Sequence, residues 1–301
     1  IFLRGLLRDS SSLFAVKIFM PLSYFIITVS IARFLGVRDF GILGILFSFY
    51  AIFRIIAVFG IDSFLLKEIP IKPEKAGDLF SNALSLGLML SFLSIIIMNF
   101  LFFVMRYPPQ VRLIGLVVSV LLLAEPINRY SESVFISFGK SKYILISTFI
   151  AETLKIFLSL AVMVVLKNLI AVLAVILLAQ LLTSLLKIIF LRKLSIYPKL
   201  LFDRDIIRDL FGSSFTLALI SAASAVFLSI DVIVLSKIAG EEAVGFYSAA
   251  YKFITLLFLV ADSIGLALLP FLSRAFRESS VLFTDSAAKV VKYFVILGVF
   301  S

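Results

Sequence analysis

The sequence predicts an all-α, polytopic membrane protein, and two observations support this fold class. Hydrophobic residues make up 62% of the 301 residues, charged residues only 15%, and the mean hydropathy is +1.19. Soluble domains carry about 25% charged residues. In addition, long apolar runs alternate with short charged, Gly-rich or Pro-rich connections. Lipid accepts apolar side chains on every outward helix face, so this composition excludes soluble domains, disordered chains and secreted disulfide folds.

The residue types that are missing exclude several kinds of chemistry. The chain contains no Cys and no His. It therefore offers no disulfide, thiolate nucleophile or zinc site of the usual kind, and no imidazole proton relay. We expect neither a metal ion nor a cofactor. The net charge of +10 does not indicate a nucleic-acid partner, because Lys and Arg gather in one alternate set of connections.

Hydropathy predicts eight membrane-spanning helices and the beginning of a ninth. A span needs about 20 predominantly apolar residues, and Gly, Pro or charged residues mark each connection. The chain begins without Met and ends inside an apolar run, so we expect a fragment of a longer protein, with no cleavable signal peptide. The predicted helices cover residues 13–33, 41–66, 79–105, 113–138, 143–166, 169–191, 213–236 and 245–270, and the ninth begins near residue 288.

The basic residues predict the orientation of the helices. Eighteen Lys and Arg, among them Lys187, are counted on the N-terminal side of the first predicted helix or with the even-numbered connections, and six are counted with the opposite set. Because connections rich in Lys and Arg stay on the cytoplasmic side, we expect a multi-pass protein of the plasma (cell inner) membrane with a cytoplasmic N-terminus.

An internal repeat predicts two lobes. A shift of 204 places the turn 33–41 over the turn 237–245, with Gly36 over Gly240 and Gly41 over Gly245. Six helices separate the copies, so equivalent helices share their orientation, as in transporters built from parallel repeats. Chance similarity between two glycine-bounded turns is the alternative. The repeat predicts a first six-helix lobe over 1–195, a cytoplasmic linker over 196–212, and a partial second lobe over 213–301 that holds helices 7, 8 and the start of 9.

The passage 228–252, with Asp231, Gly240, Gly245 and Lys252, resembles the same region of Wzx-type polysaccharide flippases. These proteins belong to the MOP superfamily together with MATE exporters and lipid II flippases. The turn 33–41 and the basic turn 138–142 resemble further parts of that family. The resemblance implies a MATE-like two-lobed bundle of two parallel six-helix repeats, with the second lobe truncated. It also implies alternation between inward-open and outward-open states.

Two charges near the middle of predicted helices are candidate substrate contacts. A charge at the bilayer centre costs about 3 kcal/mol or more, so such a residue usually faces a cavity or a partner. Arg54 lies on a stripe with Tyr50 and Asp62 and has no acid three or four residues away. Lys252 lies in the predicted helix that the repeat pairs with 41–66. Both suit phosphate oxygens, and an ion pair between helices is the alternative role.

The predicted helix 113–138 is the most polar of the set. Glu125 and Arg129 have the i,i+4 spacing of an ion pair, so they serve either substrate binding and gating or only packing. Pro126 removes one backbone hydrogen bond and predicts a kink or hinge.

Two acids are candidates for binding a coupling ion. Asp231 has no basic residue within one turn, and the alternatives for it are a salt bridge to the other lobe or a role in capping a loop. Glu152 can pair with Lys155, for which packing is the simpler role.

The sequence thus predicts a transporter, not an enzyme, that flips polyprenyl-pyrophosphate-linked oligosaccharide across the plasma membrane by alternating access. Its expected partners are the lipid bilayer, the lipid-linked oligosaccharide, and a glycan polymerase or glycosyltransferases. One rival is a MATE-like, cation-coupled multidrug exporter, which would favour an acidic cavity. A second rival, a membrane glycan polymerase or transferase, needs an active site at one face, and the short outer connections leave little room for it.

Overall fold

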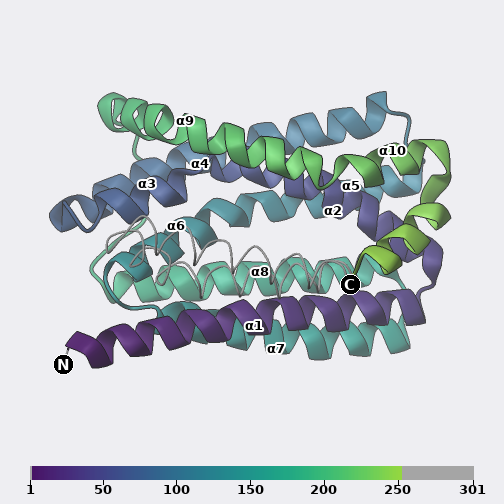
Figure 1. The fold of residues 1–301 in the computed structure, drawn as a ribbon, viewed down its shortest axis with the longest axis horizontal. Coiled ribbons are helices and arrows are strands. Elements are labelled where there is room, and N and C mark those ends of the chain that lie inside the picture. The colour runs from purple at the N-terminus through teal and green to yellow at the C-terminus, as the bar shows by residue number, and fades with distance from the viewer. Residues whose placement is uncertain (1, 253–301) are drawn as a thin grey trace, which may run out of the picture. The chain divides into compact units, whose positions relative to one another are not determined.

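The computed structural model describes residues 2–252, which are almost entirely helical (Figure 1). The chain divides into two compact units, Ile1–Gly245 and Phe246–Ser301. The account below concerns the first unit, and the second is described only as far as Lys252. The helices in order are α1 (Phe2–Phe34), α2 (Val37–Val58), α3 (Ile61–Glu68), the 3-10 helix η1 (Pro73–Lys75), α4 (Ala76–Val104), α5 (Pro109–Val120), the 3-10 helix η2 (Leu121–Leu123), α6 (Ala124–Ser137), α7 (Lys142–Val165), α8 (Leu169–Arg192), α9 (Arg204–Phe227) and α10 (Ile230–Ile238).

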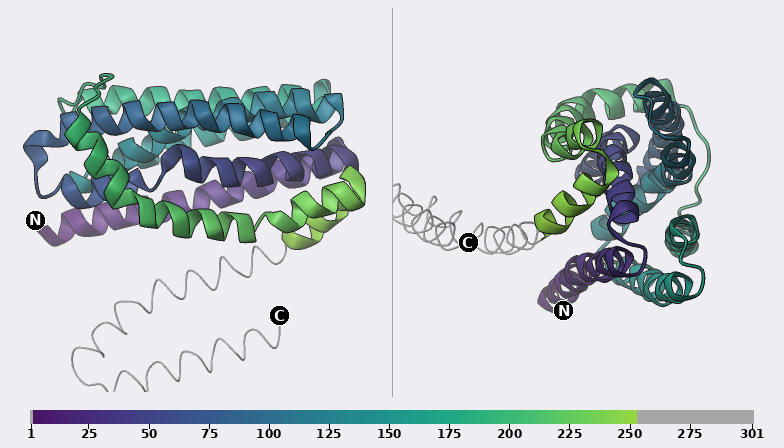
Figure 2. Two further views of the ribbon diagram at one scale, coloured as in Figure 1. Left: turned by 90° about the horizontal axis from the view of Figure 1, so that it is seen from above. Right: turned by 90° about the vertical axis from the view of Figure 1, so that its right-hand side faces the viewer.

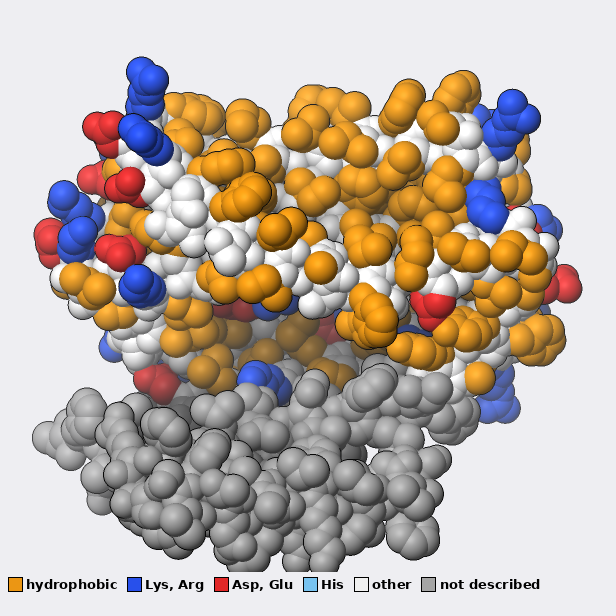
Figure 3. Space-filling model, turned by 45° about the horizontal axis from the view of Figure 1, so that its top comes forward, with side chains coloured by type: hydrophobic (Ala, Val, Ile, Leu, Met, Phe, Trp, Pro, Cys, Tyr) orange, Lys and Arg blue, Asp and Glu red, His pale blue; other side chains and the backbone are white. Residues whose placement is uncertain are grey.

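The described residues contain seven stretches that are long and apolar enough to cross a membrane, and they match the first seven predicted spans. Large apolar side chains such as Phe157 and Val165 are exposed on their outer faces. Figure 3 shows apolar side chains over the middle of the surface, while charged side chains gather towards its two ends. The predicted multi-pass membrane fold is therefore confirmed. Most of the eighth predicted helix and all of the ninth lie outside the described residues.

The predicted helix 41–66 is wrong in one respect, because it is broken at Phe59-Gly60. Both residues adopt left-handed backbone angles, with φ of 54° and 70°, and α3 starts in a new direction. The hydroxyl of Tyr130 donates to the carbonyl of Val58 at 2.9 Å, and the Ser133 hydroxyl donates to the carbonyl of Asp62 at 2.9 Å. These bonds from α6 satisfy carbonyls near the break. The predicted stripe through Arg54 therefore ends before Asp62.

Two other predicted helices are also interrupted. The 3-10 turn η2 separates α5 from α6 just before Pro126, as expected where a proline lacks the N–H that would continue the helix. The predicted helix 213–236 begins earlier, at Arg204, because the Asp203 carboxylate accepts hydrogen bonds from two N–H groups of the first turn. That helix then breaks between α9 and α10, so Asp231 lies in the first turn of a new short helix.

The packing places α2 at the centre of the first unit. It contacts α1, α4, α5, α6, α9 and α10, and α1 also packs on α7, which packs on α8 (Figure 2). A buried apolar cluster surrounds α2 at one end of the unit, and a second cluster joins α3, α4 and α6 at the other. Polar side chains on α2, α6 and α8 lie between these clusters.

Candidate functional site

A network of polar side chains joins α2, α6 and α8. The Tyr50 hydroxyl donates to Oε1 of Glu125 at 2.5 Å, and Nε2 of Gln180 donates to the same oxygen at 3.1 Å. Glu125 is buried, so its charge depends on these two donors and on the nearby guanidinium of Arg129. Buried polar groups are costly unless they are paired in this way.

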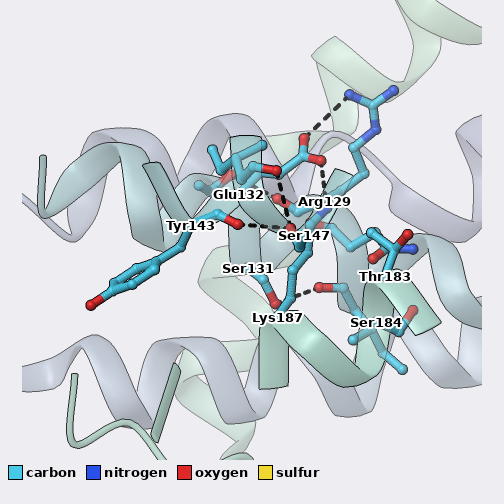
Figure 4. A network of polar contacts seen from close by, with 12 residues as sticks. Arg129, Ser131, Glu132, Tyr143, Ser147, Thr183, Ser184 and Lys187 are labelled. Atoms are coloured by element: carbon cyan, nitrogen blue, oxygen red, sulfur yellow. Dashed lines mark hydrogen bonds and ion pairs between the residues drawn. The ribbon is translucent and has the colours of Figure 1, made fainter. Parts of the chain in front are cut away.

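Arg129 lies between two carboxylates. Its Nε atom is 3.9 Å from Glu125 Oε2, which is the ion pair that the i,i+4 spacing predicts, and its NH1 atom is 3.9 Å from Glu132 Oε2. Glu132 also accepts a hydrogen bond from Lys187 of α8, with Nζ 2.7 Å from Oε1. Figure 4 shows Glu132 between these two cations. The network therefore runs without interruption from Tyr50 to Lys187.

Lys187 differs from the prediction. The charge distribution assigns it to the connection that follows the sixth predicted helix, but it lies inside α8 with only 2% of its side chain exposed. A polar stripe on an otherwise apolar helix could have identified it, since Gln180, Thr183, Ser184 and Lys187 follow the i, i+3, i+4, i+7 spacing of one helix face.

Arg54 differs from the other cations of this region. It lies one turn beyond Tyr50 on α2 and is half-buried. Within the described part of the chain, no carboxylate lies within ion-pair distance of its guanidinium. Arg129 and Lys187, by contrast, are both paired. Three acids, including Asp62, accompany these three bases, so the region has no large cationic excess, and Arg54 is its uncommitted positive charge.

A cavity of about 150 Å³ lies between α1, α2, α7 and α8. Its polar lining includes Thr28, Tyr50, Gln180 and the pair formed by Glu152 and Lys155. The Lys155 ammonium is 2.5 Å from the Glu152 carboxylate, which confirms the predicted pairing. Glu152 therefore faces a cavity, but its charge is already balanced by a lysine of the same helix.

The two remaining candidate residues belong to the region after α9. Oδ1 of Asp231 accepts a hydrogen bond from the N–H of Val232 at 2.8 Å, in the first turn of α10. Lys252 belongs to the second compact unit, so its predicted role beside Arg54 stays a prediction. Thr255 and Asp262, which share its predicted stripe, lie outside the described residues.

A second polar cluster joins α10 to the connection between α4 and α5. The ammonium of Lys237 lies 3.3 Å from the centre of the Tyr107 ring and donates to the carbonyl of Met105 at 2.5 Å. The Tyr107 hydroxyl is 2.7 Å from Oγ of Ser236. Burial raises the pKa of the Tyr107 phenol, so the ring stays neutral in the folded protein.

Among residues 2–252, no group of three or more Asp or Glu side chains is arranged to hold a metal ion. The acids of the polar network are instead bonded to Tyr50, Gln180, Arg129 and Lys187. Charge pairing, and not metal coordination, accounts for their arrangement.

Comparisons with known proteins agree with this fold. The sequence profile of a family described as "Polysaccharide biosynthesis protein" matches residues 6–276. A multidrug-resistance MATE family transporter of the MOP superfamily, solved in an inward-facing conformation, superposes with a TM-score of 0.70 at 17% identity, over 91% of this chain and 67% of that one. A MOP superfamily transporter from Pyrococcus furiosus, described as having a binding pocket of reversed polarity, superposes with a TM-score of 0.63 at 17% identity, over 97% and 69%. A search of curated proteins gave no match.

Proposed function

Because the chain belongs to the polysaccharide biosynthesis protein family and has a MATE-like fold, we propose that it flips lipid-linked oligosaccharide across the membrane. The head group, a pyrophosphate that carries sugars, would enter the polar interior while the polyprenyl tail stays in lipid. Rocking of the lobes would then expose the head group on the other side. This extends the coarser assignment, membrane transport, which the family and the fold support.

The observation that carries the proposal is the state of Arg54. The Glu125, Arg129, Glu132 and Lys187 charges satisfy one another, so they need no substrate to be stable where they lie. Arg54 has no carboxylate at ion-pair distance among the described residues. A guanidinium binds phosphate oxygens in a planar, two-pronged geometry. An uncommitted arginine inside a membrane helix therefore fits an anionic head group better than a cationic drug.

We further propose that Arg129 and Glu125 hold the side chains around Arg54 in place and contact the sugars of the head group. Lys252 would supply a second cation for the pyrophosphate. For energy coupling, we propose Asp231 and Glu152 as the acids that a returning cation would bind. A coupling proton at Glu152 would have to release Lys155. When the cytoplasm is negative, moving one negative charge outward across the membrane is favourable by about 2.3 kcal/mol of free energy per 100 mV of membrane potential.

The orientation belongs to the same proposal. Removal of the buried Lys187 leaves seventeen Lys and Arg on the side of the N-terminus against six on the other. That bias supports a cytoplasmic N-terminus in the plasma membrane. A glycan polymerase or glycosyltransferases that make or use the substrate are the proposed partners.

The test is flipping by the full-length protein in proteoliposomes. The probe is a polyprenyl pyrophosphate that carries a fluorescent amino sugar, and a membrane-impermeant reductant bleaches only the outer leaflet. We expect Arg54→Ala to slow flipping at least tenfold and Arg54→Lys to retain more activity, because lysine keeps the charge but not the planar fork. Arg38→Ala, which removes an exposed arginine near the start of α2, is the matched control and should flip normally.

Two results would contradict the proposal. Normal flipping by Arg54→Ala would remove Arg54 from the substrate site. Transport of a cationic dye by the wild-type protein, with no flipping of the pyrophosphate probe, would instead support the multidrug exporter.

A further inference from the structure

The connection between α8 and α9, residues 193–203, is held firmly against α4, and we call it the strap. Backbone N–H groups at alternate positions donate to α4 side chains: Lys199 to Oγ of Ser81 at 3.3 Å, Leu201 to Oγ of Ser85 at 2.9 Å, and Asp203 to Oδ1 of Asn82 at 2.6 Å. Alternate groups of an extended chain point the same way, so the three bonds define one edge of the strap.

The three α4 side chains in this contact are buried, and each is hydrogen-bonded both to α4 and to the strap. Ser81, Asn82 and Ser85 are each at most 2% exposed. Each also donates to a carbonyl of α4 one turn earlier. All three side chains therefore act as donors to their own helix and acceptors for the strap, and this arrangement fixes the position of the strap on the helix.

The strap also carries large apolar side chains that no part of the first unit covers. Tyr197 is 58% exposed, Leu200 is 68% exposed and Phe202 is 66% exposed. Large apolar groups clustered on a fixed, non-helical segment are unfavourable in water. Their exposure indicates that another apolar phase covers them.

The position of the strap along α4 indicates which phase that is. Leu201 is bonded to Ser85, and Met89, one helical turn further along, is 57% exposed on the apolar outer surface. One turn of helix is about 5.4 Å. Leu200 and Phe202, on either side of Leu201, therefore lie within about one turn of the lipid-facing band, at the depth of the membrane interface.

Charge around the strap is also suited to lipid head groups. Lys193, Lys199 and Arg204 are exposed at or beside it. Asp203 and Asp205 lie beside them, but the Asp203 carboxylate accepts hydrogen bonds from the N-terminal N–H groups of α9, and the positive end of the helix dipole offsets part of its charge. Aromatic side chains beside Lys and Arg are typical of segments that lie at a membrane interface, and anionic lipids attract such basic groups.

We propose that the strap is an interfacial anchor that binds anionic phospholipid. Tyr197, Leu200 and Phe202 insert between head groups and acyl chains, and Lys193, Lys199 and Arg204 bind phosphate groups of the lipids. The anchor fixes the strap, and with it the start of α9, at the membrane surface. This inference does not depend on which substrate the protein carries.

None of the 301 residues is Trp, so tryptophan fluorescence can report on the strap once any Trp elsewhere in the full-length protein is replaced by Phe. Phe202→Trp introduces one fluorescent reporter into the full-length protein, in vesicles of phosphatidylcholine with phosphatidylglycerol. In separate samples, one lipid or the other carries bromine on its acyl chain. We expect blue-shifted emission that is quenched more strongly by brominated phosphatidylglycerol than by brominated phosphatidylcholine. Phe157→Trp, on the exposed face of α7, calibrates quenching by lipid without a preference.

The proposed role of the basic side chains is tested by a separate measurement. Lys199→Gln in the Phe202→Trp background should lower the preference for phosphatidylglycerol about fivefold, because one basic group near the surface contributes that much to anionic lipid binding. Emission typical of indole in water would overturn the proposal, and so would blue-shifted emission without quenching, which means that protein covers the strap. Equal quenching by the two lipids would overturn the assignment of anionic head groups. If Phe202→Trp does not fold, Tyr197→Trp gives the same readings.

Discussion

Gly41 of α2 and Gly245 pack backbone against backbone. A Cβ atom on Gly41 would overlap the carbonyl of Glu241 and lie 2.9 Å from the Gly245 nitrogen, and one on Gly245 would overlap the carbonyl of Val37. These glycines close the two turns that the predicted repeat superimposes, and the turns also share left-handed glycines, Gly36 with φ of 92° and Gly240 with φ of 80°. The two turns therefore meet each other at one end of the first unit.

Gly41→Ala should destabilise the protein, because the added methyl group has to displace backbone. Overpacking of this kind costs about 1–3 kcal/mol. The free energy of unfolding in detergent, from denaturant titration, measures the effect. Gly77→Ala is the control, since a Cβ there meets no atom within 4 Å. A wild-type stability for Gly41→Ala would contradict the close backbone contact.

The buried ion pair between Lys187 and Glu132 should respond asymmetrically to substitution. Glu132→Gln leaves the Lys187 ammonium, which is 2% exposed, without a carboxylate, and the loss of one partner of a buried pair costs about 3–5 kcal/mol. Lys187→Met should cost less, because Glu132 is 25% exposed and keeps Arg129. The double variant should recover most of the loss.

The free energies of unfolding of the two single variants and the double variant form a mutant cycle. Glu68→Gln, which removes an ion pair whose lysine is 53% exposed, is the control and should change stability by about 1 kcal/mol or less. Losses that simply add in the double variant would show that Lys187 and Glu132 do not interact.

Tyr107 should make part of the stability depend on pH. Because burial raises the pKa of its phenol in the folded state, the folded protein favours the neutral ring. This contribution is fully present below the unfolded pKa of about 10 and is lost as the pH rises through the folded-state pKa. Tyr107→Phe should be about 1 kcal/mol less stable at neutral pH, through the lost hydrogen bond to Ser236.

As the pH rises above about 10, the difference in unfolding free energy between wild type and Tyr107→Phe should shrink. The phenylalanine ring can still form the cation–π contact with the Lys237 ammonium. Any effect of Lys237 titration on stability is therefore the same in both proteins and cancels in the difference between their unfolding free energies. A pH-independent difference for Tyr107→Phe would contradict the role of phenol burial.

The break between α2 and α3 should depend on Gly60 and Tyr130. Gly60→Ala places a side chain at φ of 70°, a conformation that costs about 1–3 kcal/mol for other residues. Tyr130→Phe removes the donor to the Val58 carbonyl and should cost about 1–3 kcal/mol, because a buried acceptor is left unsatisfied. Thermal unfolding midpoints in detergent measure both. Tyr143→Phe is the control for loss of a hydroxyl, and a continuous, stable helix in either variant would contradict this account.

Long apolar helices and the glycine turns were predictable from the sequence, because hydropathy and glycine placement act locally. Hydropathy predicts the seven spans of the described residues. Spacing along one helix predicts two ion pairs, Glu125 with Arg129 and Glu152 with Lys155. Spacing determines which side chains share a helix face. The interruption before Pro126 follows from the same local chemistry.

Contacts between helices, in contrast, were decided only by the tertiary structure. Nothing in the sequence between Arg54 and Asp62 shows that Tyr130 and Ser133 of α6 stabilise a break at Phe59-Gly60. Nor does local sequence place Lys187 beside Glu132, or the strap on Ser81, Asn82 and Ser85. Composition and spacing along the chain determined that this protein spans a membrane and which neighbours pair within a helix. Packing decided which charges are neutralised and which, like that of Arg54, have no acid beside them among residues 2–252, because a buried charge takes its partner from whichever helix lies next to it in space.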